Sequence, residues 1–176
     1  MRPIAIVVGL VIAGCSAGCS GSPDVDAGQV ERAADFHSPR VEATIESASR
    51  VVRTRGFASD GAEQRGFLVD QATEVRSIPM RTGSCWVILA AGSSALRELD
   101  LLVFDADGAE VARDGEQGAM AVVRFCPAQN GTYYASLRAA AGSGLYALRT
   151  FRGPTGLAFR VDDVVRAVGS TPAAPE

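Results

Sequence analysis

From residue 66 onward the sequence repeats one pattern, in which a short apolar or alternating run is followed by residues that favour turns. Short strands with turn signals at intervals of roughly ten residues are typical of an antiparallel β-sandwich. The longer spacing of βαβ units, which a parallel sheet requires, does not occur. The sequence therefore predicts an antiparallel sandwich with strands near residues 67–69, 75–80, 85–91, 99–104, 120–126, 132–139 and 145–151.

The segment before these strands has the spacing of an amphipathic helix. Ser38 and Pro39 offer an N-cap and a first-turn proline, and Gly56 offers a stop. A β-branched pair at 51–52 leaves a strand as the alternative. We expect a short amphipathic helix over 38–56, with an apolar face made of Val41, Ile45, Ala48 and Val52.

The first residues combine a basic start at Arg2 with an apolar run over 4–13. A helix that crosses a bilayer needs about 20 apolar residues, so this run is too short and has the form of a secretory signal. The run leads into Ile12, Ala13, Gly14 and Cys15, which together resemble the lipobox of bacterial lipoproteins.

This resemblance implies that a signal peptide of residues 1–14 is cleaved before Cys15 and that the thiol of Cys15 is lipidated. Ser16 follows the cysteine, where lipoproteins of the inner membrane usually have an aspartate, so the resemblance also implies a place in the outer membrane. Lipidation at Cys19 is one alternative, and an ordinary signal cleaved at a later small residue is another.

The rest of the chain divides by composition. Residues 15–37 are rich in Gly, Ser, Ala and Asp and are expected to be a lipidated tether. The helix of 38–56 then leads into a sandwich domain over 57–168, and 169–176 are expected to be a disordered tail. Within the sandwich domain, 157–168 fit either a last strand or a short helix, because their apolar residues match both periods.

Cys85 and Cys126 remain after the two N-terminal cysteines. Two cysteines in a secreted domain usually pair, so we predict a disulfide between them, with two separate buried thiols as the alternative. Closing a loop of this length would stabilise the fold by about 4 kcal/mol through the entropy of the unfolded chain. The two thiols lack the close spacing and further ligands of a zinc site.

Three groups of residues between 66 and 151 resemble the bacterial pre-peptidase C-terminal domain, a jelly-roll-like β-sandwich. They are the run 83–90, the run 99–108 with its Asp-x-Asp-Gly turn, and the segments 124–127, 130–134 and 142–146. The resemblance implies a mainly β fold, an antiparallel jelly-roll-like sandwich, preceded here by the short amphipathic helix. No peptidase domain precedes the matching region, so the accessory role of that family in secreted proteases does not carry over.

The carboxylates offer a candidate calcium site at one turn. Asp105, Asp107 and Glu110 could supply several of the six to eight oxygens that calcium takes. The loop lacks the remaining ligand positions of an EF-hand, and Asp105 and Asp107 also suit a hairpin turn in which Gly108 takes a positive φ. We favour the turn and expect no metal or other cofactor.

Tyr134 is the aromatic residue most suited to contact a ligand. In strand 132–139 the alternation places Tyr133 inward with Ala135 and leaves Tyr134 on the polar face with Ser136. Trp86, next to Cys85, points to the opposite side of its strand from that cysteine.

Composition narrows the function. The net charge of −3 argues against a nucleic-acid partner, and a chain with no lysine and only His37 as histidine lacks most familiar catalytic machinery. We expect no enzyme but a membrane-anchored lipoprotein of the cell envelope with a non-catalytic binding or accessory module. Its partners would be the membrane, through the lipid, and an envelope or extracellular protein or glycan. A purely structural spacer and a small envelope hydrolase are the alternatives.

Overall fold

The computed structural model describes residues 38–115 and 117–169. The predicted signal peptide 1–14, Cys15, Cys19, the tether 15–37 and residues 170–176 of the predicted tail lie outside the described residues.

The first described element is the expected helix, α2 (Pro39–Thr54). The hydroxyl of its N-cap Ser38 accepts a hydrogen bond from the Val41 N–H at 3.4 Å, and Pro39 stands at the start of the first turn. Beyond the C-cap Arg55, Gly56 has a φ of 90°, which favours glycine. The helical prediction is confirmed, and the buried face comprises the predicted Val41, Ile45, Ala48 and Val52, together with Ser49.

Nine strands in the described residues form two antiparallel sheets. The first sheet has the order β1-β9-β4-β7, with β2 also paired to β9. Its strands are β1 (Ala58–Ser59), β2 (Gln64–Leu68), β4 (Ser84–Gly92), β7 (Met120–Phe125) and β9 (Gly144–Pro154). The second sheet has the order β3-β8-β5-β6 and consists of β3 (Thr73–Met80), β5 (Leu96–Phe104), β6 (Glu110–Arg113) and β8 (Gly131–Gly142). Each predicted run overlaps a strand, and the predicted mainly β sandwich is confirmed.

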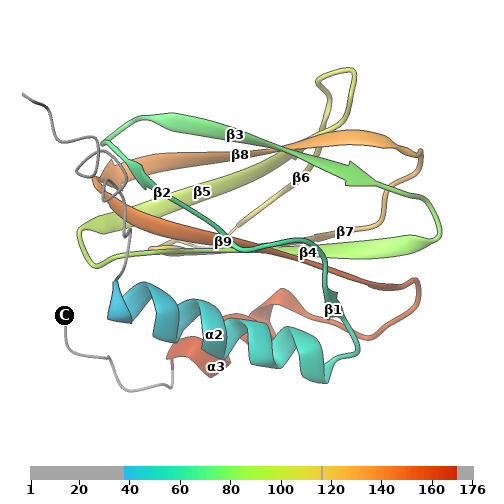
Figure 1. Cartoon of the computed structure of the whole chain (residues 1–176), viewed down its shortest axis with the longest axis horizontal. Coiled ribbons are helices and arrows are strands. Elements are labelled where there is room, and N and C mark those ends of the chain that lie inside the picture. The colour runs from blue at the N-terminus through green and yellow to red at the C-terminus, as the bar shows by residue number, and fades with distance from the viewer. Residues whose placement is uncertain (1–37, 116, 170–176) are drawn as a thin grey trace, which may run out of the picture. The chain divides into compact units, whose positions relative to one another are not determined.

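Strand β4 lies between two buried clusters, one between the sheets and one beneath the helices. Its odd-numbered residues Cys85, Val87 and Leu89 pack with the helices, and its even-numbered residues Trp86 and Ile88 pack between the two sheets. A strand that is buried on both faces needs a continuous apolar run, which is what this segment has. The second sheet, the first sheet and the helices therefore lie in successive layers (Figure 1).

The ambiguous segment 157–168 contains a helix, α3 (Val161–Gly169), instead of a last strand. Gly169, which we predicted to begin the tail, is its last residue. Helix α3 buries Val164, and Phe159, just before it, packs edge-on against Phe57 with ring centroids 5.4 Å apart. The outer face of the first sheet is apolar, and α2 and α3 together cover it. As a helix, the segment can bury its apolar side chains against this face. Neither helix has the length and apolar character needed to span a membrane.

Candidate functional site

The two sheets differ in what lies on their outer faces. Helices α2 and α3 pack on the first sheet (Figure 1). No helix in the described residues packs on the outer face of the second sheet, which exposes Val75 (56%) and Tyr134 (38%), and Val111 on its edge strand β6 is 41% exposed. These side chains project from β3, β6 and β8, so the second sheet presents a partly apolar surface. On the first sheet, Phe67 of β2 is also 50% exposed.

Strand register shows that this surface is continuous. Tyr134 on β8 pairs with Ser77 on β3 and with Phe104 on β5. Directly opposite residues in antiparallel strands have their Cβ atoms about 5 Å apart, so these side chains form a row across the sheet. The neighbouring row runs through Val75, Ser136, Leu102 and Arg113. We call these two rows, together with Val111, the exposed face.

Tyr134 lies where the alternation placed it. Its side chain belongs to the exposed face, whereas Tyr133 is only 5% exposed and its ring packs against Phe125, with centroids 5.4 Å apart. Trp86 likewise points into the inter-sheet core, on the side opposite to Cys85.

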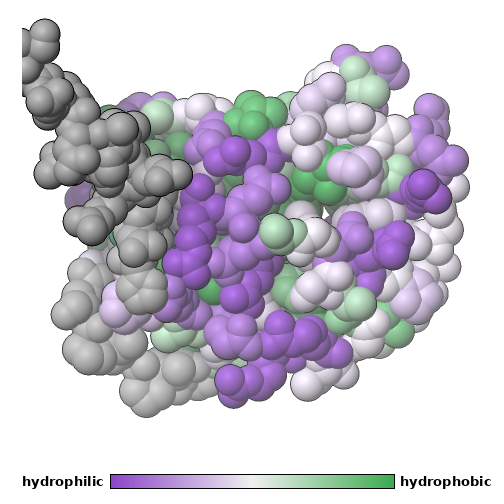
Figure 2. Space-filling model, in the orientation of Figure 1, coloured by the Kyte–Doolittle hydropathy of each residue, from purple (hydrophilic) through white to green (hydrophobic). Residues whose placement is uncertain are grey.

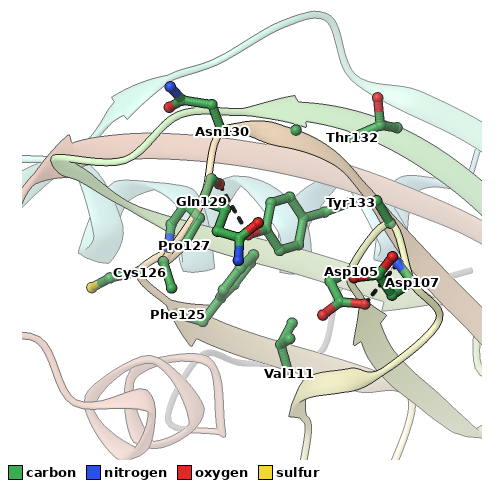
Figure 3. A pocket seen from close by; sticks show the side chains of 13 residues that line it. Asp105, Asp107, Val111, Phe125, Cys126, Pro127, Gln129, Asn130, Thr132 and Tyr133 are labelled. Atoms are coloured by element: carbon green, nitrogen blue, oxygen red, sulfur yellow. Dashed lines mark hydrogen bonds between the residues drawn. The ribbon is translucent and has the colours of Figure 1, made fainter.

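A pocket of about 260 Å³ opens at one end of the exposed face (Figure 3). It lies between the β5–β6 turn and the connection from β7 to β8, and it is lined by 105–107, Val111, 125–132 and Tyr133. The rings of Phe125 and Tyr133 contribute aromatic walls, and the Tyr133 hydroxyl donates a hydrogen bond of 3.1 Å to the carbonyl of Gln129. Thr132 lines the pocket and pairs with Pro79, next to the pair of Ser77 and Tyr134, so the pocket adjoins the exposed face.

The β5–β6 turn fixes two carboxylates at the pocket. Oδ1 of Asp105 accepts hydrogen bonds from the N–H groups of Asp107 (3.0 Å) and Ala109 (2.9 Å), and Gly108 has a φ of 81°. This geometry is that of an Asx turn, in which an aspartate side chain stabilises the bend. Among the described residues that line the pocket, Asp105 and Asp107 are the charged ones.

The third residue of the candidate calcium site is engaged elsewhere. Glu110 on β6 accepts hydrogen bonds of 2.6 Å from Nε and from Nη2 of Arg113, and this guanidinium holds the pKa of Glu110 below its ordinary value. Residues 38–115 and 117–169 contain no group of three or more His, Cys, Asp or Glu side chains that could hold a metal ion. The structure thus does not bring Asp105, Asp107 and Glu110 together as a ligand set.

The disulfide between Cys85 and Cys126 is present, as predicted. Trp86 on β4 pairs with Phe125 on β7, so the two cysteines occupy the next cross-strand position, with Cα atoms 4.1 Å apart. Cys85 is fully buried against the helices, whereas Cys126 is exposed and lines the pocket. The bond therefore ties the start of the pocket loop to the central strand β4.

A second polar cluster fastens α2 to the first sheet. Arg149 on β9 donates hydrogen bonds to Glu63 (2.5 Å), Glu46 (2.7 Å) and Ser49 (3.0 Å). Burial alone would lower the pKa of Arg149, but the hydrogen bonds to Glu46 and Glu63 raise it on balance. Figure 2 shows hydrophilic residues gathered on the side of the molecule where β2 and α2 lie. Because each member of this cluster is paired, the cluster fixes structure and offers no free group for chemistry.

No protein-family model matches the chain, and no curated protein matches it. Some solved structures are similar to part of the chain. One is PliG of Aeromonas hydrophila, a periplasmic inhibitor of g-type lysozyme, which is 16% identical with a TM-score of 0.43, over 56% of this chain and 89% of that one. Another is the pre-peptidase C-terminal domain of a collagenase from Bacillus anthracis, which is 16% identical with a TM-score of 0.42. The match covers 51% of this chain and 87% of that domain. At this level the similarity concerns the fold alone and transfers no function.

Sequence reasoning missed the pocket and the partner of Glu46. We could find Tyr134 because a period of two fixes its face within one strand. The pocket instead depends on Asp105 and Gln129, which are far apart in sequence and meet because β8 pairs with β5. The sequence does show apolar residues at 125, 127 and 133 and two aspartates at 105 and 107. Only the order of the strands shows that these two groups lie at the same end of the sheet.

Proposed function

We propose that this chain is a lipid-anchored protein of a bacterial cell envelope and that its sandwich domain binds a partner protein through the exposed face without catalysing a reaction. The observation that carries the proposal is the unequal cover of the two sheets. Both helices pack on the first sheet, although Phe67 of its strand β2 stays exposed, while no helix in the described residues covers Val75, Val111 and Tyr134 on the second sheet. Tyrosine is favoured in binding surfaces because its ring is apolar and its hydroxyl can donate a hydrogen bond.

Two carboxylates of the described residues are held in ion pairs that suit a structural role. Glu46 and Glu110 both have their pKa values lowered by hydrogen bonds from arginines, Arg149 in the first case and Arg113 in the second. General acids in active sites usually need the opposite shift, towards neutral pH. These carboxylates are therefore suited to structural ion pairs.

The anchor part of the proposal rests on the sequence. Ile12, Ala13, Gly14 and Cys15 have the lipobox pattern, and Ser16 fits sorting to the outer membrane. Several acyl chains hold a protein on a membrane far longer than one chain does, so the domain would remain at the envelope surface where its partner is located.

The test is photocrosslinking in intact cells. A photoreactive amino acid replaces Ser77, which is exposed and pairs with Tyr134, and a matched control carries it at the exposed Arg50 on α2. We expect a discrete, protease-sensitive adduct from position 77 that is absent from position 50 and is lost when Tyr134→Ser is added.

Two results would contradict the proposal. A structural spacer predicts no specific adduct from either position. A glycan partner predicts an adduct that glycosidases remove and proteases leave attached to the labelled peptide.

A further inference from the structure

We propose that the pocket between the β5–β6 turn and the β7–β8 connection binds an arginine side chain of the partner protein. The inference deepens the proposed function and rests on it, because it names the chemistry of the group that would dock at the end of the exposed face. Size, walls, charge and position each support it.

The pocket has the size for one side chain. Sites for drug-sized ligands and cofactors occupy about 300–1,000 Å³, and the volume of about 260 Å³ lies below that range. A long, unbranched side chain that enters from the surface suits such a space better than a larger ligand.

The walls suit a flat cation. In Figure 3 the side chains of Phe125, Tyr133 and Gln129 lie around the same space, with Val111 below and Pro127 at one side. Guanidinium groups stack on aromatic rings, and their weak hydration lowers the cost of removing them from water. The aliphatic part of the arginine would contact Val111 and Pro127.

The charge of the pocket calls for a positive partner. Within the described ranges, the carboxylate of Asp107 has no hydrogen bond or ion pair. In Asp105, Oδ1 accepts hydrogen bonds from two backbone N–H groups, and Oδ2 accepts none within these ranges. Glu110, on the same hairpin, is by contrast paired with Arg113. Neither Asp105 nor Asp107 has an ion pair within the described residues, so the aromatic walls and these two charges together favour a guanidinium over a neutral sugar, which would leave both charges without a counterion.

The position of the pocket connects it with the exposed face. Val111 and Thr132 line the pocket, and Thr132 pairs with Pro79 in the row beyond Tyr134. A partner that covers Tyr134 would therefore reach the pocket mouth without a change in the sandwich.

The test uses the full chain, produced in a bacterial envelope, solubilised in mild detergent and labelled with ¹⁵N. Acetyl-arginine-methylamide is titrated while the backbone N–H signals of Asp107, Gln129 and Tyr133 are followed. Acetyl-citrulline-methylamide has nearly the same shape without the charge, and N-acetylglucosamine represents a glycan. We expect saturable shifts with the arginine probe and at least a fivefold weaker response to the citrulline probe.

Variants then assign the binding to the pocket. Asp107→Asn removes one charge and should weaken binding of the arginine probe at least fivefold. Glu98→Gln also replaces a carboxylate by an amide, but on β5 outside the pocket lining, and should change the affinity less than twofold. Phe125→Leu leaves the turn intact and should also weaken binding, so the test does not depend on one variant. Unchanged signals from β9, which does not pair with β7, show that each variant is folded.

Several outcomes overturn the inference. Equal binding of the arginine and citrulline probes excludes a charge-based site, tighter binding of N-acetylglucosamine indicates a glycan site, and equal losses in Asp107→Asn and Glu98→Gln indicate nonspecific attraction. Adducts from position 77 without arginine binding refute the arginine site and leave the proposed function standing. Arginine binding without such adducts supports the site and contradicts the proposed function.

Discussion

The hydroxyl of Tyr146 on β9 donates a hydrogen bond to Glu74 on β3, 2.5 Å away, and so links the two sheets across the sandwich. Arg76 pairs with Glu74 and donates to the same hydroxyl at 2.9 Å. Gly66, the partner of Tyr146 on β2, leaves room for the ring, because a Cβ there would lie 2.6 Å from a ring carbon. Tyr146 thus combines apolar burial with a polar link between layers.

Tyr146→Phe should destabilise the fold. The ring remains, but Glu74 and Arg76 lose a buried hydrogen-bonding partner. Such a loss costs about 1–2 kcal/mol, which should appear as a lower midpoint in urea unfolding followed by circular dichroism. Tyr134→Phe is the matched control, because Tyr134 is exposed and its variant should unfold like the wild type. Equal midpoints for the two variants would contradict a structural role of the Tyr146 hydroxyl.

Tyr146 also predicts how stability depends on alkaline pH. Burial, with the hydrogen bond to Glu74, raises the pKa of Tyr146 from 10.0 to about 12. Above pH 10 the unfolded chain therefore loses this proton before the folded protein does, and the free energy of unfolding falls as the pH rises towards about 12. Urea unfolding at intervals across this range should show the decline, and Tyr146→Phe should reduce it while Tyr134→Phe does not. A wild-type curve parallel to that of Tyr146→Phe would refute this assignment.

The sequence predicts correctly those elements in which apolar residues recur with one clear period along the segment. The alternation around Tyr133 and Tyr134 predicted their faces, and the four-residue spacing from Val41 to Ile45 predicted the buried side of α2. In both cases the local period alone decides which side chains point to the core.

Other features depend on tertiary contacts and were missed. Strand β6 has only four residues, mostly exposed, so it shows no alternation of apolar residues. For 157–168 both periods were present, and packing on the apolar outer face of the first sheet favours the helix α3. The spacing of Glu46 and Arg50, one helical turn apart, predicts an ion pair between them. Glu46 instead pairs with Arg53 and with Arg149 on β9, which only the fold brings near.

Arg149→Met should weaken the attachment of α2. The change leaves Glu46, Glu63 and Ser49 without their shared donor beneath the helix. Because the cluster is partly open to solvent, we expect a loss of about 1–2 kcal/mol in the free energy of unfolding, measured by urea denaturation. Arg113→Met breaks an exposed ion pair with Glu110 and should leave stability unchanged. Equal effects of the two substitutions would show that the cluster does not fasten the helix.

Removal of the disulfide should lower stability more than either of these changes. The bond between Cys85 and Cys126 closes a loop with a sequence separation of 41, which corresponds to about 4 kcal/mol on the chain-entropy model. The variant carrying Cys85→Ala and Cys126→Ala should unfold at a much lower temperature and keep its strand content, because apolar alternation positions the strands. Wild-type protein in dithiothreitol should match it. A reduced wild type that remains as stable as the oxidised form would exclude a stabilising role for the bond.

Lipidation at Cys15 is the prediction on which the envelope location depends. The pattern Ile12, Ala13, Gly14 and Cys15 follows a short apolar run, and acyl chains on this thiol would anchor the mature chain. Metabolic labelling with an alkyne fatty acid should tag the wild type in the membrane fraction and fail to tag Cys15→Ala. Cys19→Ala is the matched control and should be labelled like the wild type. Label that persists in Cys15→Ala and disappears in Cys19→Ala would instead move both the lipid and the cleavage site to Cys19.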